Sequence, residues 1–218
     1  NRLFKLGDKL LLTISGGADS VALAYLLKEL SYNFSLAHCN FGLRNKDSDK
    51  DEDFVKSLAK KMDVACFVKN FKTKDFADEN KISIQMAARD LRYNWFEQVR
   101  RQNNFDFILT AHHRDDDIET FLINLLRGTS IKGMLGIHSK KRKLVRPFLF
   151  AQKQEIYDFL QRNKIEFRKD SSNKDVKYLR NKIRRKLIPL LKEINPSFNE
   201  TLAKEKNYLG AVSEIYFT

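Results

Sequence analysis

Residues Lys9–Leu27 have the sequence KLLLTISGGADSVALAYLL, in which an apolar run, a glycine-containing turn and an amphipathic segment follow one another. The apolar run predicts a short buried strand over Lys9–Ile14, and apolar residues at helical spacing predict a helix over Ala18–Ser31. Gly16 and Gly17 allow the intervening backbone to turn tightly and to come close to a ligand. This succession is typical of a loop that binds phosphate at the N-terminus of a helix.

The turn also carries side chains suited to phosphate. Ser15 and Ser20 have hydroxyl donors, and the N–H groups at the start of the following helix add further donors and a favourable dipole. Asp19 would repel phosphate unless a cation lay between them, and Mg²⁺ prefers carboxylate and phosphate oxygens as ligands. The turn is not a Walker A loop, since no Gly-Lys-Ser/Thr follows. The alternative is an ordinary glycine turn with a serine cap.

Segments typical of strands and of helices alternate as far as Phe150. Further strands are expected over Asn33–Cys39, Val64–Lys69, Phe105–Ala111 and Leu144–Phe148, and helices over Asp47–Met62, Ser83–Gln102 and Asp115–Arg127. This alternation predicts an α/β fold with a doubly wound, mostly parallel five-stranded sheet and helices on both faces. After Phe150 only helices are expected, over Gln152–Asn163, Val176–Ile194 and Asn199–Tyr216. We therefore expect a phosphate-binding domain at 1–150 and a basic helical subdomain at 151–218, which continues into further C-terminal domains.

Positive charge is concentrated in one part of the chain. The net charge is +13, and Ser139–Lys192 alone holds 18 Lys/Arg against 5 Asp/Glu, which accounts for all of it. Such a block suits a polyanionic partner such as nucleic acid, and a solvated basic surface is the alternative. No run of about 18 apolar residues exists, so no membrane span is expected. Cys39 and Cys66 form neither a CxxC pair nor a zinc set, which predicts reduced thiols and a cytoplasmic protein.

Several motifs narrow the family. The segment SGGADS at Ser15–Ser20 resembles the SGGxDS loop of the N-type ATP pyrophosphatases, which cleave ATP between its α- and β-phosphates and adenylate a substrate. Six further segments resemble those of the tRNA(Ile)-lysidine synthetase family, in the family's order: HCNFGLR at His38–Arg44, QMAARDLRY at Gln85–Tyr93, AHHRDDDIET at Ala111–Thr120, the Arg-Pro pair at 146–147, DSSN at Asp170–Asn173 and YLRNKIRR at Tyr178–Arg185. The chain departs from the family pattern at Phe41, where the family has His, and at Asp117, where it has Gln.

The resemblance implies a ligase that forms a C–N bond in two steps. O2 of the wobble cytidine in a minor tRNA(Ile) with a CAU anticodon attacks the α-phosphate of ATP, and pyrophosphate is released. The ε-amine of L-lysine then attacks C2 of the adenylated base and expels AMP, which leaves lysidine in the tRNA. The domain at 1–150 would then be an N-type ATP pyrophosphatase domain.

The resemblance and the chemistry of the residues together give a candidate site. ATP is expected to contact Ser15, Gly16, Gly17, Ala18, Asp19, Ser20 and His38, and Mg²⁺ to contact Asp19 and Asp116. Catalytic roles are expected for Asp19, Arg89, Asp116 and Glu119, with Glu119 or Asp116 holding the lysine amine and taking its proton. Contacts with RNA phosphates are expected for Arg180, Asn181, Arg184 and Arg185. The structural alternatives are a structural His38, acids that stabilise a helix N-terminus, surface ion pairing of Arg89 with Asp90 or Glu97, and a basic helix that only covers the domain.

Three other functions are weighed against this one. A tRNA thiolase shares the loop and a basic surface but normally needs catalytic or cluster-binding cysteines, and the chain has no CxxC. A small-molecule adenylating ligase of the same superfamily would not require the basic block. A non-catalytic RNA-binding module would not require the loop or the acids. Release of AMP that depends on ATP, lysine and tRNA, with lysine retained on the RNA, separates all four.

Overall fold

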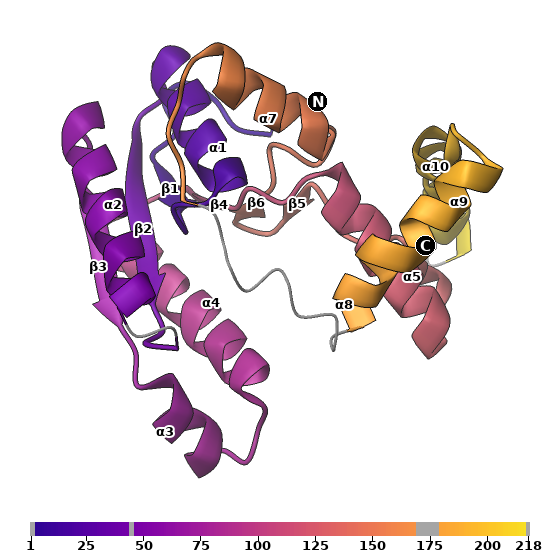
Figure 1. The fold of residues 1–218 in the computed structure, drawn as a ribbon, viewed down its shortest axis with the longest axis horizontal. Helices are drawn as coiled ribbons and strands as arrows, with labels where there is room; N and C mark the ends of the chain where they lie inside the picture. The colour runs from indigo at the N-terminus through magenta and orange to yellow at the C-terminus, as the bar shows by residue number, and fades with distance from the viewer. Residues whose placement is uncertain (1–2, 44–45, 169–178, 217–218) are drawn as a thin grey trace.

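A six-stranded sheet forms the centre of the computed structural model, which describes residues 3–43, 46–168 and 179–216 (Figure 1). The strands are β1 (Leu10–Thr13), β2 (Phe34–Asn40), β3 (Cys66–Asn70), β4 (Phe107–Leu109), β5 (Lys140–Lys141) and β6 (Leu144–Val145). They lie in the order β3-β2-β1-β4-β6-β5, and all neighbours are parallel except β5 and β6. The chain runs outward from β1 to β3 and then crosses to β4 on the other side of β1. This reversal creates a switch point between β1 and β4, where doubly wound sheets bind their ligands.

The central strand β1 is buried on both faces because its three leucines alternate between two cores. Leu10 and Leu12 face the core that includes residues of α1 (Ala18–Glu29), α2 (Lys46–Met62) and α7 (Lys153–Arg162). Leu11 faces the opposite core, which is filled by aromatic residues of α4 (Ile84–Gln102). All three leucines are 0% exposed, as expected for the centre of a parallel sheet covered by helices on both sides.

A second group of helices packs around α5 (Arg114–Arg127), whose apolar face meets the C-terminal helices in a third core. This group contains α6 (Ile131–Met134), α8 (Leu179–Lys182), a π-helical segment (Ile183–Leu187), α9 (Ile188–Ile194) and α10 (Phe198–Tyr216). In Figure 1 these helices lie beside α5, on the opposite side of the molecule from α2 and β3. Pro189 follows the π-helical segment, and because it lacks an N–H it cannot donate to the carbonyl four residues earlier.

The expected fold class is confirmed, with one correction to the sheet. It has six strands and not five, because the chain turns at Arg142 (φ 55°) and pairs Lys140–Lys141 with the strand that was predicted over Leu144–Phe148. That strand ends at Val145. Ser83 caps α4, and its hydroxyl accepts the Met86 N–H at 3.2 Å.

Two helices were not predicted, α3 (Thr73–Glu79) and α6. The helix expected over Val176–Ile194 is described from Leu179 onward. Arg44 and Asp170–Asn173 lie outside the described residues. No helix in the described part of the chain is long and apolar enough to cross a membrane.

Candidate active site

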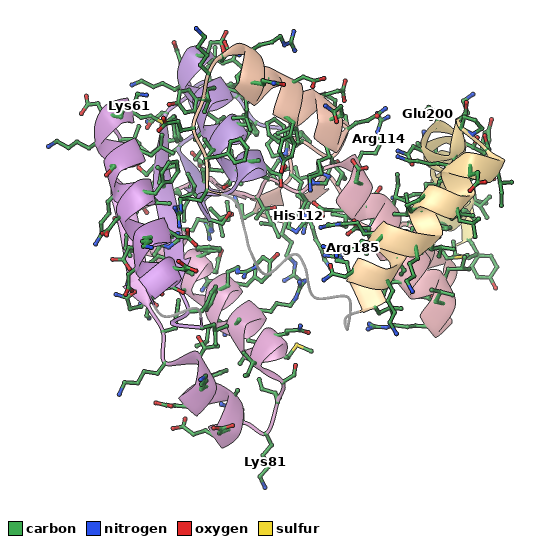
Figure 2. All side chains as sticks on the ribbon, viewed as in Figure 1. Lys61, Lys81, His112, Arg114, Arg185 and Glu200 are labelled. Atoms are coloured by element: carbon green, nitrogen blue, oxygen red, sulfur yellow. The ribbon has the colours of Figure 1, made fainter. Side chains whose placement is uncertain are left out.

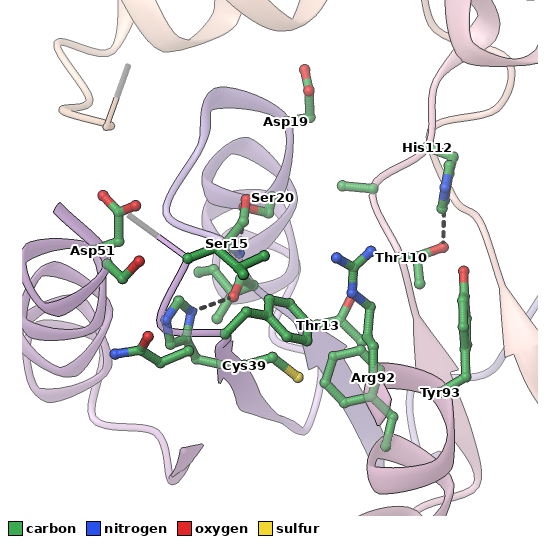
Figure 3. Close-up of a pocket in the computed structure, with 18 of the residues that line it drawn as sticks. Thr13, Ser15, Asp19, Ser20, Cys39, Asp51, Arg92, Tyr93, Thr110 and His112 are labelled. Atoms are coloured by element: carbon green, nitrogen blue, oxygen red, sulfur yellow. Dashed lines mark hydrogen bonds between the residues drawn. The ribbon is translucent and has the colours of Figure 1, made fainter. Parts of the chain in front are cut away.

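A cavity of about 420 Å³ lies at the C-terminal ends of β1, β2 and β4, at the switch point of the sheet (Figure 3). Its wall is built from segments that are far apart in the sequence, and it includes Ser15, Asp19, Ser20, His38, Cys39, Asp51, Arg92, Thr110, His112, Asp116 and Arg180. Six of the residues singled out from separate motifs therefore share one cavity: Ser15, Asp19, Ser20, His38, Asp116 and Arg180.

The phosphate loop, residues Ser15–Ser20, is held by its own hydroxyl groups. Ser20 Oγ donates to the Gly17 carbonyl at 3.0 Å, and the Ser15 N–H points to Ser20 Oγ at 3.2 Å. Gly16 has a φ of 86°, a conformation that side chains with a Cβ rarely adopt. Helix α1 begins at Ala18 without a side-chain cap at Gly17, so its first N–H groups are left for a ligand.

Arg168 holds the loop through a hydrogen bond, and Asp51 holds Arg168. The sequence motifs identified neither residue. The Arg168 N–H donates to the Gly16 carbonyl at 2.9 Å, and Arg168 Nε donates to Asp51 Oδ1 at 2.9 Å. Asp51 is 7% exposed and lines the cavity. Because Arg168 and Asp51 are distant in the sequence, no spacing rule could have paired them.

Asp19 lies at the first turn of α1 with one oxygen lacking a partner. Its Oδ1 is buried without a hydrogen bond among the described residues, and its Oδ2 lies 3.8 Å from Nε2 of His113. Burial raises the pKa of Asp19, and the nearby His113 opposes that rise. A buried carboxylate oxygen without a partner carries a desolvation cost that a bound cation would offset.

His113 connects Asp19 to the acids at the start of α5. The His113 ring is 2% exposed, and its Nε2 also lies 3.6 Å from Asp116 Oδ2. The Asp116 carboxylate accepts the His113 N–H at 3.2 Å, which satisfies one free donor of the helix N-terminus. The sequence motif contained His113, but its spacing gave no reason to assign it a role. Asp116 therefore serves the helix end and lines the cavity at the same time.

Asp117, one of the two departures from the family motif, has a different task. Its Oδ1 accepts the Ile137 N–H at 2.7 Å, and its Oδ2 forms an ion pair with Lys206 of α10. A glutamine could accept the hydrogen bond but could not form the ion pair. This residue therefore ties α5 to the segment before β5 and to the last helix.

Glu119 faces arginines. It is 1% exposed, and Arg184 donates to both of its oxygens, from Nε at 2.5 Å and from Nη2 at 3.0 Å. Arg180 Nε lies 3.5 Å from Glu119 Oε2, and its Nη2 donates to Thr120 Oγ1 at 2.8 Å. Figure 2 shows the side chains of this arginine-bearing segment, where Arg185 is labelled, beside those of α5. The acid and basic motifs, predicted separately, thus form one group.

Two histidines of the cavity wall are kept neutral by burial. His38 Nδ1 lies 2.8 Å from the Ile14 carbonyl and must donate to it, which leaves Nε2 as an acceptor; burial lowers the pKa of His38. His112 Nδ1 lies 2.9 Å from Thr110 Oγ1, and burial lowers the pKa of His112 to about 4. Each ring is thus held by a fixed hydrogen bond and offers a neutral imidazole to the site.

The arginines of α4 are placed differently from the expectation. Arg92, and not Arg89, lines the cavity in the described part of the chain, and its guanidinium lies 5.1 Å from the ring centroid of Phe41. Phe41 in turn stacks on Phe71 at 5.6 Å. Arg89 is exposed and its guanidinium lies over the ring of Tyr93 at 5.0 Å. The departure at Phe41 therefore creates an aromatic support for Arg92.

Both cysteines are free thiols, and one reaches the cavity. Cys39 lines the wall, and burial raises the pKa of its thiol to about 12. Burial also raises the pKa of Cys66. Neither thiol is therefore a ready nucleophile near neutral pH, because the thiolate is the reactive form.

Protonation of His112 should weaken the fold in mildly acidic solution. The pKa of His112 falls from 6.5 to about 4 on folding, so its contribution to stability is fully present above pH 6.5 and is lost as the pH falls toward 4. The His112→Asn variant should show a smaller change in unfolding free energy between pH 4 and 6.5, measured by urea denaturation. His138→Asn, at an exposed site, is the matched control and should keep the wild-type slope. An unaltered slope in His112→Asn would contradict the assignment.

Comparison with known proteins places the chain among ATP-binding proteins. Residues 3–191 match an ATP-binding family described as a PP-loop domain. Curated relatives include the tRNA(Ile)-lysidine synthases of Bacteroides thetaiotaomicron, 47% identical over 98% of this chain and 50% of the relative, and of Thermosipho africanus, 39% identical over 93% of this chain and 48% of the relative. The chain thus spans about half the length of the curated relatives it matches.

Solved structures show the same fold at low sequence identity. They include a U34-tRNA thiolase, NcsA, from Methanococcus maripaludis, with a TM-score of 0.75 and 19% identity over 94% of this chain and 72% of that one. An NH3-dependent NAD synthetase from Campylobacter jejuni has a TM-score of 0.54 and 17% identity over 93% of this chain and 86% of that one. The family match covers the strands, the phosphate loop and the arginine-bearing segment, and the chain belongs to the PP-loop domain family of ATP-binding proteins.

Proposed function

We propose that this chain is the catalytic part of a tRNA(Ile)-lysidine synthase, which adenylates the wobble cytidine of a tRNA(Ile) with a CAU anticodon and then joins L-lysine to C2 of that base. The observation that carries the proposal is one cavity bordered by the phosphate loop, by Asp116 and by Arg180. It offers a place for a triphosphate beside groups that can bind an amine and an anion. The names of the relatives described above support the choice of substrates.

ATP is proposed to bind with its phosphates at the phosphate loop. The first N–H groups of α1 and the hydroxyl of Ser15 donate to phosphate oxygens, while Ser20, whose hydroxyl donates to the Gly17 carbonyl, lines the site beside them. Neutral His38 presents Nε2 as an acceptor, which suits an amino or hydroxyl donor of the nucleoside. Adenylation requires the O2 atom of cytidine to form a bond to the α-phosphorus while the bond from that phosphorus to the leaving pyrophosphate breaks.

Mg²⁺ is proposed to bind between Asp19 and the phosphates, with Asp116 nearby. The buried, unpartnered Oδ1 of Asp19 fits this cation, because Mg²⁺ takes one or two carboxylates together with phosphate oxygens. No set of three or more His, Cys, Asp or Glu side chains within the described residues is arranged as a metal site of its own. When bound, the cation would neutralise charge on the phosphates during release of pyrophosphate.

Asp116 is our candidate for holding the lysine ε-amine. That amine must lose its proton before it attacks C2, since its ordinary pKa is about 10.4. Asp116 lines the cavity, whereas the Glu119 carboxylate is buried and occupied by Arg184.

The RNA is proposed to lie along the basic helical segment, where Arg180, Asn181, Arg184 and Arg185 are clustered. The target base must leave the anticodon stack to reach the cavity.

The proposed reaction can be tested with labelled lysine. The protein incubated with ATP, Mg²⁺, lysine and tRNA(Ile) carrying a CAU anticodon should release AMP and retain the label on the RNA. A tRNA with a different wobble base is the control and should retain none. Release of AMP without lysine on the RNA would refute the proposal and favour another adenylating reaction of the same fold.

Asp19 should be required for the first step. Asp19→Ala removes the proposed cation ligand, so pyrophosphate release with tRNA and ATP should fall by about 100-fold or more. Asp90→Ala, at an exposed site on α4, is the matched control and should retain wild-type release. Release by Asp19→Ala at the wild-type rate would remove Asp19 from the site.

Cys39 discriminates this function from that of a tRNA thiolase, the activity named for one protein of similar fold. Cys39→Ser changes the only cysteine that lines the cavity among the described residues. Lysine transfer should remain within about threefold of wild type, because no step of the proposed reaction uses a thiol. Loss of an ATP-dependent transfer of sulfur to tRNA in this variant would instead establish the thiolase.

A further inference from the structure

The phosphate loop has no positive side chain of its own. From Ile14 to Ala22 the sequence contains no Lys or Arg, while Asp19 adds a negative charge. A bound triphosphate and a departing pyrophosphate need positive charge in addition to backbone N–H donors. Apart from the proposed Mg²⁺, any such charge must come from elements elsewhere in the chain.

The segment of α8 and the π helix supplies two guanidinium groups at this position. Arg180 lines the same cavity as the loop residues, and its side chain is 44% exposed. Arg184 is 31% exposed, and its Nη2 lies 3.6 Å from Asp116 Oδ1, within the group of charges that includes Asp19. Arg180 therefore borders the cavity, and Arg184 lies beside Asp116, which also lines it.

Glu119 determines where these guanidiniums point. Its two oxygens accept from Nε and Nη2 of Arg184, which fixes the plane of that guanidinium, and the second oxygen also faces Arg180. A carboxylate that is 1% exposed and surrounded by arginines is a poor partner for an incoming lysine ammonium. Glu119 balances one of the two arginines, and Asp116 and Asp19 carry the other negative charges of this group.

We propose that Arg180 and Arg184 bind the β- and γ-phosphates of ATP and that Glu119 is the residue that positions them. When cytidine O2 forms its bond to the α-phosphorus, the electron pair of the breaking P–O bond stays on pyrophosphate, and the two guanidiniums stabilise that charge. This inference rests on ATP as the substrate of the proposed function. It gives Arg180 and Arg184 a role in nucleotide binding in place of RNA binding, which leaves Asn181 and Arg185 for the RNA. It also excludes Glu119 as the acceptor of the lysine proton.

Nucleotide binding in the absence of tRNA and lysine tests the arginines directly. Arg180→Ala and Arg184→Ala should each weaken ATP binding by roughly tenfold or more, since a charged hydrogen-bonding group is lost, and should change AMP binding by less than twofold. Lys186→Ala, an exposed cation on the same segment, is the matched control and should bind both nucleotides as wild type does. Equal losses for ATP and AMP, or unchanged ATP affinity, would overturn the proposal.

The Glu119→Gln variant tests the positioning role. It should reproduce the selective loss of ATP affinity, because Arg184 loses its charged partner, whereas a mere proton acceptor would leave ATP binding unchanged. Circular dichroism must first show that this variant is folded. If it is not, the loss of ATP affinity in Arg180→Ala, at a partly exposed site, still tests the proposal. A wild-type protein that binds ATP no better than AMP would also refute the inference. Selective ATP binding without any lysine on tRNA would refute only the proposed function.

Discussion

The burial of β1 on both faces is the constraint on which the rest of the structure depends. Leu10 and Leu12 close one core and Leu11 closes the other, so the strand cannot shift by one residue without exposing leucines or losing contacts. With β1 fixed between β2 and β4, the chain that leaves it must turn at Gly16 and enter α1. The packing of β1 thus fixes the position of the site independently of its polar groups.

The polar half of the site depends on a second, electrostatic constraint. Glu119 and Arg184 are 65 positions apart in the sequence, yet their paired hydrogen bonds join α5 to the C-terminal helices above the third apolar core. Breaking such a buried pair leaves an uncompensated charge, which costs about 3–5 kcal/mol. The geometry of the arginines is therefore coupled to the docking of the whole helical group.

Local patterns in the sequence were sufficient to predict most helices and strands and the phosphate loop of the site. The strand, turn and helix of Lys9–Ser31 were predictable because each depends on neighbouring residues. The two-residue strand β5 was not predictable, since it forms only through its pairing with β6. Arg89 was preferred to Arg92, because helical spacing places both on related faces and only tertiary packing shows which one meets the cavity. Contacts such as Arg168 with Asp51 have no local signal at all.

The hydrogen bond from Arg168 to the Gly16 carbonyl has a consequence for synthesis of the protein on the ribosome. Chains are made from the N-terminus, and early segments can fold while later ones are still inside the exit tunnel. Gly16 emerges long before Arg168. A nascent chain can therefore form β1 and α1 but cannot yet form the hydrogen bond from Arg168 that holds the turn. Competence to bind nucleotide should thus arrive only after the segment that follows α7 has emerged.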